Sequence, residues 1–141
     1  MKYSTRLADA IHILVLIATS DACCTSAKLA ESIATNPAHI RKLMSQLKKS
    51  GILLTTQGKA APALCAAPEE ITLLDLYRCM EGDTPLLHLD THTNPDCHEG
   101  IHIQLALQEY YDQLQKSFEE QMKQITLSDL IERYHQRIQQ S

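Results

Sequence analysis

The sequence is poor in the residues that build aromatic cores and tight turns. Its 141 residues contain no tryptophan, one phenylalanine and four glycines, although 44% of them are hydrophobic. The core must therefore consist mainly of leucine, isoleucine and alanine, with some tyrosine. Leucine and alanine favour helices, so we predict a mainly α-helical protein with enough residues for one compact domain.

Acidic residues are missing from one long stretch. No Asp or Glu lies between residues 32 and 68, which hold five basic residues, Arg41, Lys42, Lys48, Lys49 and Lys59. Because the whole chain has a net charge of −4, these five positive charges leave −9 for the remainder. A basic patch on an acidic protein is typical of a nucleic-acid-binding surface.

The chain also lacks a disulfide pattern and a membrane-spanning run. Its five cysteines are an odd number without a repeated spacing, unlike the framework of a secreted protein. The apolar run at residues 11–18 is too short to cross a bilayer, and Asp9 and His12 make it a poor signal peptide. We therefore expect a cytoplasmic protein with reduced thiols and no membrane partner.

Within the basic stretch, residues 25–50 have the pattern of a helix-turn-helix. Thr25 is a suitable N-cap for a short first helix, whose Leu29, Ala30 and Ile33 share one face. Asn36 followed by Pro37 is typical of the start of a second helix, and Gly51 ends that helix after Ser50.

The second helix has an apolar stripe of Ile40, Leu43, Met44 and Leu47, which leaves a polar and basic face outward. Arg and Lys neutralise phosphates and bind guanine edges, and Gln and Ser contact other base edges, so we predict a major-groove recognition helix. An ordinary solvated helix face is the alternative interpretation. The candidate DNA-binding residues are Lys2, Tyr3, Thr25, Ser26, Lys28, Pro37, His39, Arg41, Lys42, Ser45, Gln46, Lys48, Lys49 and Lys59.

The flanking segments predict the remaining elements of the fold. We expect a first helix over residues 5–19, a two-stranded wing from residues 52–56 and 63–66, and a helix that Thr72 caps and Gly82 ends. An irregular segment over residues 83–99 then precedes a long helix from about residue 100 to 124, and Thr126 caps a final helix. Residues 1–82 would form the DNA-binding region, and residues 83–141 the sensor loop and dimerisation helices, in one compact unit.

The long helix carries more apolar surface than its own domain can easily cover. We predict that it dimerises the protein through Leu107, Tyr111, Leu114 and Phe118, which lie on its apolar stripe. The alternative is that this stripe packs across its own domain.

Two motifs resemble a known family. They are Pro-Glu-Glu-Ile-Thr-Leu-Leu-Asp-Leu at residues 68–76, followed by Glu81-Gly82, and Ile-Thr-Leu-Ser-Asp-Leu at residues 125–130. With the order of elements, they resemble the Rrf-two (Rrf2) family of bacterial winged-helix transcriptional regulators over nearly the whole chain. The resemblance implies a homodimer with crossed long helices that binds a partly palindromic operator, in our interpretation as a repressor. The wing departs from the family pattern because Lys59 is its single basic residue.

The cysteines depart from the family pattern as well. Members that hold an iron–sulfur cluster carry three cysteines in the loop before the long helix, whereas this loop has only Cys97. One thiolate cannot hold a cluster that needs about four ligands, so we expect no cluster. The candidate sensor is then Cys97 with His98, for an unknown small-molecule or redox effector.

A cluster of histidines suggests a different class of function. His88, His92, Cys97, His98 and His102 lie close together in the sequence, but we match their spacing to no standard zinc site. The alternative function is therefore a metal-dependent enzyme or metal-binding module built on residues 88–102. Because the chain has neither a glycine-rich phosphate loop nor a nucleophile elbow, we predict a regulator without catalytic residues, cofactor or metal.

Overall fold

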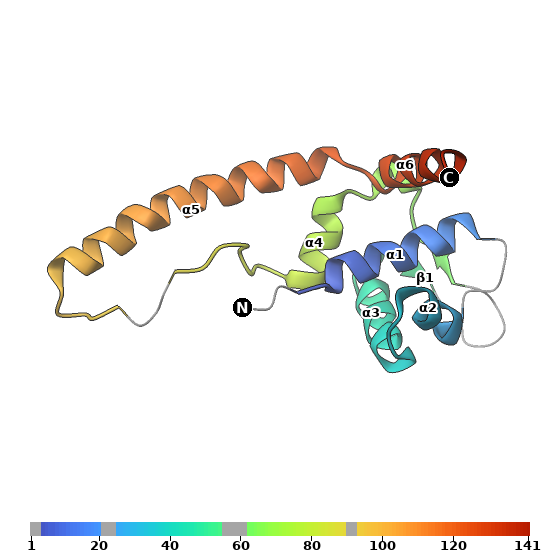
Figure 1. The fold of residues 1–141 in the computed structure, drawn as a ribbon, viewed down its shortest axis with the longest axis horizontal. Coiled ribbons are helices and arrows are strands. Elements are labelled where there is room, and N and C mark those ends of the chain that lie inside the picture. Colours follow the sequence, from blue (N-terminus) through green and yellow to red (C-terminus); the bar gives the residue numbers. More distant parts are fainter. Residues whose placement is uncertain (1–3, 21–24, 55–61, 90–92) are drawn as a thin grey trace.

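The computed structural model describes residues 4–20, 25–54, 62–89 and 93–141 (Figure 1). Helices dominate these residues, with a small antiparallel pair of strands and one long helix, which confirms the predicted fold class. In chain order the elements are α1 (Arg6–Thr19), α2 (Ser26–Ile33), α3 (Pro37–Lys49), β1 (Leu53–Leu54), β2 (Ala63–Leu64), η1 (Pro68–Glu70), α4 (Leu73–Glu81), α5 (His98–Gln124) and α6 (Leu127–Gln139).

Side-chain caps fix the boundaries of the helix-turn-helix as predicted. The Thr25 hydroxyl accepts a hydrogen bond from the Lys28 N–H at 3.2 Å, and the Asn36 side chain accepts one from the His39 N–H at 2.8 Å. These bonds satisfy N–H groups that the first turn of a helix leaves free. Gly51 follows α3 with a φ of +74°, a conformation that glycine adopts without steric cost.

Among the described residues the wing strands are shorter than predicted, because Ile52, Cys65 and Ala66 lie outside them. Leu53 pairs with Leu64 and Leu54 with Ala63 in antiparallel register, and the Cys65 N–H donates to the Ile52 carbonyl at 2.9 Å. The predicted strands extended over residues 52–56 and 63–66. Residues 55–61, with the predicted turn and Lys59, lie outside the described residues.

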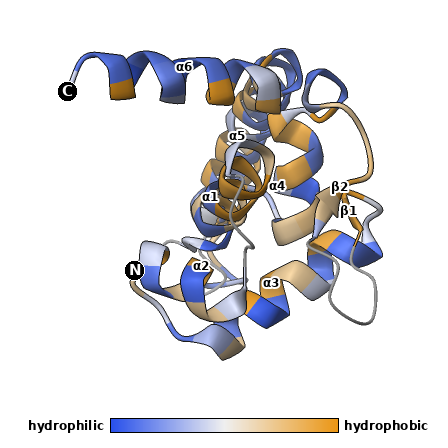
Figure 2. Cartoon of the chain, turned by 90° about the vertical axis from the view of Figure 1, so that its right-hand side faces the viewer, coloured by the Kyte–Doolittle hydropathy of each residue, from blue (hydrophilic) through white to orange (hydrophobic). Residues whose placement is uncertain are grey.

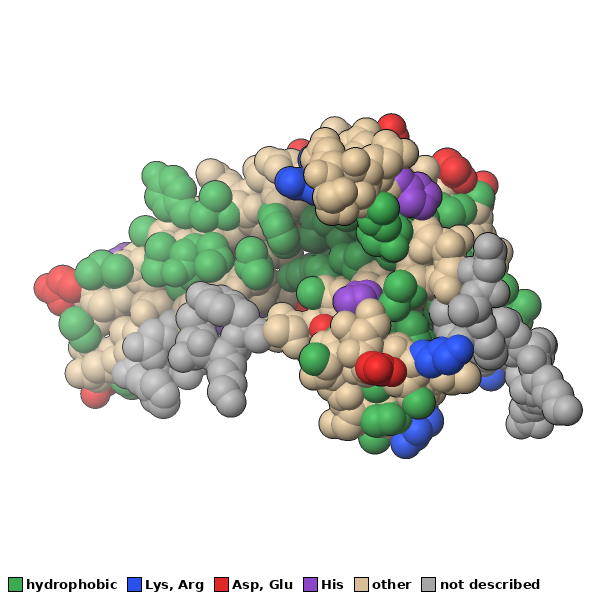
Figure 3. All heavy atoms as spheres, turned by 45° about the vertical axis from the view of Figure 1, so that its right-hand side comes forward, with side chains coloured by type: hydrophobic (Ala, Val, Ile, Leu, Met, Phe, Trp, Pro, Cys, Tyr) green, Lys and Arg blue, Asp and Glu red, His purple; other side chains and the backbone are tan. Residues whose placement is uncertain are grey.

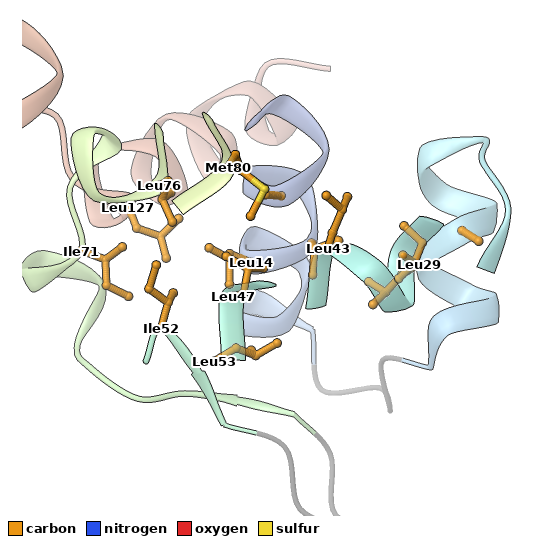
Figure 4. Close-up of a cluster of buried hydrophobic side chains, with 14 residues drawn as sticks. Leu14, Leu29, Leu43, Leu47, Ile52, Leu53, Ile71, Leu76, Met80 and Leu127 are labelled. Carbon is orange, nitrogen blue, oxygen red and sulfur yellow. The ribbon is translucent and has the colours of Figure 1, made fainter. Parts of the chain in front are cut away.

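Helix α1 is the centre of the main core. Figure 1 shows it between the helix-turn-helix on one side and α4 and α6 on the other. Ile13 and Leu14 of α1 are fully buried. Figure 4 shows side chains of this core converging from α2, α3, α4, the wing and α6, including Leu29, Leu43, Leu47, Leu53, Leu76 and Leu127.

Helix α5 extends far beyond this core (Figure 1). Its C-terminal part packs on α4, where Met122 is buried with Leu74 and Tyr77. Its N-terminal part contacts the segment before it, where Gln104 Nε2 donates to Thr93 Oγ1 at 2.6 Å. The Phe118 ring meets the Tyr77 ring edge to face, with centroids 5.9 Å apart. Phe118, which we predicted on the dimer surface, thus packs on α4 of its own chain and is partly buried, and its role in a dimer stays a prediction.

The start of α5 also differs from the prediction. The helix begins at His98 and not at Gly100, because Cys97 acts as its N-cap and the Cys97 Sγ accepts a hydrogen bond from the Gly100 N–H at 3.3 Å. Cysteine is not a usual capping residue, so the sequence pattern did not indicate this boundary. Within the described residues, no helix is both long and apolar enough to cross a membrane.

Candidate nucleic-acid interface

Helix α3 buries one face and exposes the other. Ile40, Leu43 and Leu47 are fully buried and hold the helix against the core. The opposite face exposes Arg41, Lys42, Ser45, Lys48 and Lys49. The 3.6-residue periodicity therefore predicted correctly which side of α3 faces solvent at these positions.

The cations of this face have no acidic partner among the described residues. The described residues form ion pairs elsewhere, such as Arg6 with Glu81 at 2.8 Å and Arg78 with Glu119 at 3.3 Å, but none that involves Arg41, Lys42, Lys48 or Lys49. Figure 3 shows Lys and Arg side chains on the lower lobe, which α2 and α3 form. Unpaired cations on a protruding helix can exchange their counterions for DNA phosphates.

A shallow hollow separates α2 from the exposed face of α3. It has a volume of about 300 Å³, and Ser26, Arg41, Met44, Ser45 and Lys48 line it. Two cations and two hydroxyl groups around an open depression suit a phosphate oxygen, because each can donate a hydrogen bond to it. Ser26 at the start of α2 and Arg41 on α3 are thereby brought to one surface.

Two residues predicted to face outward lie at the edge of the core instead. The His39 Nε2 is 3.1 Å from the Asp9 Oδ2 of α1, and both side chains are mostly buried. The side-chain oxygen of Gln46 is also buried, and no partner for it is found among the described residues. His39 and Gln46 are two helical turns apart, so both occupy the same border between the apolar stripe and the outer face. Neighbouring helices cover that border.

The remaining predicted residues divide into two groups. Thr25 supplies a helix cap and Pro37 occupies the first turn of α3, so both have local structural roles, while Lys28 is exposed on α2. Lys2, Tyr3 and Lys59 lie outside the described residues.

Sequence reasoning missed one pattern in the first turns of the long helix. Residues 98–102 read His-Glu-Gly-Ile-His, which is the His-Glu-x-x-His spacing of helical metal sites. A search for two histidines four residues apart would have found it. The rings of His98 and His102 lie 4.2 Å apart between centroids. In the part of the chain that the structure describes, no third His, Cys, Asp or Glu joins them, and His92 lies outside that part.

The helix-turn-helix, the short wing and the exposed basic face of α3 define a winged-helix DNA-binding protein. A family model described as "Iron-dependent Transcriptional regulator" matches residues 3–133, and the chain belongs to this family, Rrf2. It is thus a DNA-binding transcriptional regulator, from a family of regulators and not of enzymes.

Individual relatives agree with this assignment. A Bacillus subtilis protein named as an HTH-type transcriptional regulator, YwnA, is 36% identical over 91% of this chain and 96% of its own length. A crystal structure described as a DNA-binding protein matches with a TM-score of 0.73 and 36% identity, over 89% of this chain and 98% of its own. CymR, the global cysteine regulator of B. subtilis, has the same fold at a TM-score of 0.68 and 20% identity, over 94% and 97% of the two chains.

Proposed function

We propose that this regulator is a cytoplasmic homodimer that represses transcription by binding a partly palindromic operator, and that it does so without an iron–sulfur cluster. Residues 1–82 would bind DNA, and residues 83–141 would dimerise the protein and sense an effector, as one unit. The observation that carries the proposal is the exposed, unpaired basic face of α3 on an otherwise acidic protein.

The support for a dimer is the exposed apolar face of α5. Ile103, Leu107, Tyr110 and Leu114 follow one another at spacings of four, three and four residues, which is the seam of a helix that packs on another helix. Their side chains are 66%, 37%, 63% and 55% exposed. Figure 3 shows hydrophobic side chains along this helix. A monomer rarely leaves so long an apolar row exposed to water, so we expect a second copy of α5 to cover this row.

The terminal helix adds to that surface. Figure 2 shows α6 projecting from the body of the molecule. Its first turn is anchored by the buried Leu127, whereas Tyr134 and Ile138 farther along are 36% and 52% exposed. A two-fold dimer would pair identical surfaces of this kind.

Such a dimer explains a palindromic operator. Two copies of α3 related by a two-fold axis would enter successive major grooves about 34–36 Å apart on one side of B-DNA. Arg41, Lys42 and Ser45 would be placed to contact bases or phosphates, and Lys48 and Lys49 to contact phosphates.

The donor set does not fit the cluster that some family members carry. In the segment before α5 the single thiol is Cys97, and its sulfur already accepts the Gly100 N–H at the start of the helix. No set of three His, Cys, Asp or Glu residues converges on one point in the described ranges. A cluster generally needs about four ligands, so we propose an effector other than a cluster.

The test is a footprint on DNA upstream of the protein's own gene. We expect a symmetric protected region, which the double variant Arg41→Ala/Lys42→Ala loses or shows only at higher protein concentration. Each lost phosphate contact should lower the slope of log affinity against log salt by about one.

Lys123→Ala, which removes an exposed charge from α5, is the matched control. Unchanged affinity and slope in the double variant would refute the role of α3, and activation of transcription in vitro would refute repression.

A further inference from the structure

We infer that His98 and His102 form a binding site for one divalent late-first-row metal ion, such as Ni²⁺ or Zn²⁺, at the start of α5. This reverses the prediction of no metal that the sequence spacing suggested. The site differs from an iron–sulfur cluster because its ligands are imidazoles. Imidazole suits zinc, copper and nickel, whose affinities for nitrogen ligands are high.

The helix places the two rings within reach of one ion. Residues four apart lie on the same face of a helix, and the ring centroids of His98 and His102 are 4.2 Å apart with planes tilted by 32°. Two nitrogens that each lie about 2.0–2.1 Å from one zinc ion can be no farther than about 4 Å from each other. Both side chains are exposed, so small rotations can bring one nitrogen of each ring into position.

A hydrogen bond already orients one of the ligands. The Nδ1 of His102 is 2.7 Å from the main-chain carbonyl oxygen of His98. A carbonyl can only accept, so Nδ1 is the donor and the lone pair of the neutral ring is on Nε2. Metal-binding histidines commonly donate their second nitrogen to a carbonyl in this way, which fixes the tautomer and the ring direction. The Nε2 of His102 is thus prepared to bind a cation.

Some charges near the His98–His102 pair oppose a bound cation and others favour it. The positive end of the α5 dipole opposes a cation at the first turn. The carboxylates of Asp96 and Glu99 lie in the adjoining residues and offset it, and both residues are exposed. The sulfur of the nearby Cys97 already accepts the capping hydrogen bond from the Gly100 N–H, and its thiol lies 3.8 Å from Glu99 Oε2. Water would complete the coordination shell.

A bound ion would brace the junction between α5 and the segment before it. Gln104 Nε2 donates to Thr93 Oγ1 at 2.6 Å, and Gly100 faces Thr93 so closely that an added Cβ would lie 3.2 Å from its methyl group. The histidine pair is in the same turns of the helix. Metal binding would therefore hold the first turns of α5 in helical geometry. The polar contacts to Thr93 depend on those turns.

The experiment is Ni²⁺ titration of the full chain by calorimetry, with any affinity tag removed and the thiols reduced. We expect one ion per chain for the wild type. His98→Ala and His102→Ala should each weaken binding about tenfold or more, because one ligand then remains where two acted as a chelate. Circular dichroism of each variant checks that the helices persist. X-ray absorption of the wild-type complex supplies a measurement independent of any variant, and should show at least two imidazoles on the metal.

Two controls make the result specific. His135→Ala removes an exposed histidine of α6 that has no histidine four residues away, and should bind Ni²⁺ like the wild type. Cys97→Ser tests a thiol ligand and should also leave the affinity unchanged. No binding by the wild type, full binding by the His98→Ala/His102→Ala double variant, or loss of binding in Cys97→Ser would each overturn the inference. None of these measurements uses DNA, so they do not depend on the proposed repressor function.

Discussion

Thr72 and Thr126 face each other in an isolated antiparallel bridge, although each also caps its own helix. The Thr72 hydroxyl accepts the Asp75 N–H at 3.1 Å, and the Thr126 hydroxyl accepts the Asp129 N–H at 3.1 Å. The carboxylate of each aspartate in turn accepts a hydrogen bond from the main-chain N–H of its threonine. Helices α4 and α6 therefore begin side by side, each with a complete capping box.

Main-chain hydrogen bonds on both sides of the bridge join the two helix starts. The Leu73 N–H donates to the Ile125 carbonyl, and the Leu127 N–H donates to the Ile71 carbonyl, both at 2.8 Å. The two copies of the Ile-Thr-Leu-x-Asp-Leu motif thus meet in space. This contact ties the chain after α5 to the helix-turn-helix core, into which Leu127 is fully buried.

We predict that Thr72→Ala and Thr126→Ala each lower the free energy of unfolding by about 1 kcal/mol, because each removes an N-cap. Urea unfolding at a fixed protein concentration measures the change. Thr72→Ser and Thr126→Ser keep the hydroxyl and should stay within a few tenths of a kcal/mol of the wild type. Equal losses in the Ala and Ser variants would show that the methyl group, and not the cap, supplies the stability.

A second prediction separates the structural role of His39 from DNA contact. His39→Ala should lower the free energy of unfolding by about 1 kcal/mol, because it breaks the partly buried pair with Asp9. Its operator affinity should change less than that of Arg41→Ala, for which a lost contact costs about 1–3 kcal/mol. Fluorescence anisotropy with labelled operator DNA measures both affinities.

Asp9→Asn is the matched control for this prediction. This substitution weakens the same His39–Asp9 pair, but the changed residue lies on α1 and not on the exposed face of α3. It should therefore reduce stability without reducing operator affinity. If His39→Ala weakens DNA binding as strongly as Arg41→Ala while Asp9→Asn does not, then His39 turns outward on DNA.

The third prediction concerns the dimer. Leu114→Glu places a charge in the exposed apolar seam of α5, and burying an unpaired carboxylate between two copies is costly. We expect the wild type to be a dimer and Leu114→Glu to be a monomer at micromolar concentration by light scattering, with unchanged helix content.

Phe118 provides the comparison for the dimer prediction. Phe118→Ala removes a ring that packs on Tyr77 of the same chain, so it should lower the stability of the fold by about 2–3 kcal/mol, somewhat less than for a fully buried ring. It should remain a dimer under native conditions. A monomeric wild type, or dissociation caused by Phe118→Ala and not by Leu114→Glu, would contradict the assignment of the seam.

Local signals predicted most of the helix starts. Thr25, Asn36, Thr72 and Thr126 are caps whose partners lie within three residues, so the information is in adjacent sequence. Helical periodicity likewise separated the buried Leu43 from the exposed face of α3. Such features depend on neighbours along the chain, and sequence patterns describe these well.

Features that depend on contacts between distant segments were not predictable in this way. The position of His39 is set by Asp9 on α1, and that of Phe118 by Tyr77 on α4. His39 lies at the border of one apolar stripe and Phe118 on another, and periodicity alone cannot decide which neighbour covers them. The pairing of Thr72 with Thr126 also required the fold, although both motifs were visible in the sequence.

The last prediction concerns Cys97, the one thiol of the segment before α5. Its sulfur caps the helix through the Gly100 N–H. Serine is a preferred N-cap, so Cys97→Ser should keep the helix start, the stability and the operator affinity under reducing conditions. We expect wild-type protein purified without oxygen to be colourless and to lack the visible absorbance of an iron–sulfur cluster. Cys65→Ser, at an exposed thiol near the wing, is the control. A brown protein that loses its colour in Cys97→Ser but not in Cys65→Ser would show that distant residues complete a cluster with Cys97, and the proposal of a cluster-free regulator would be wrong.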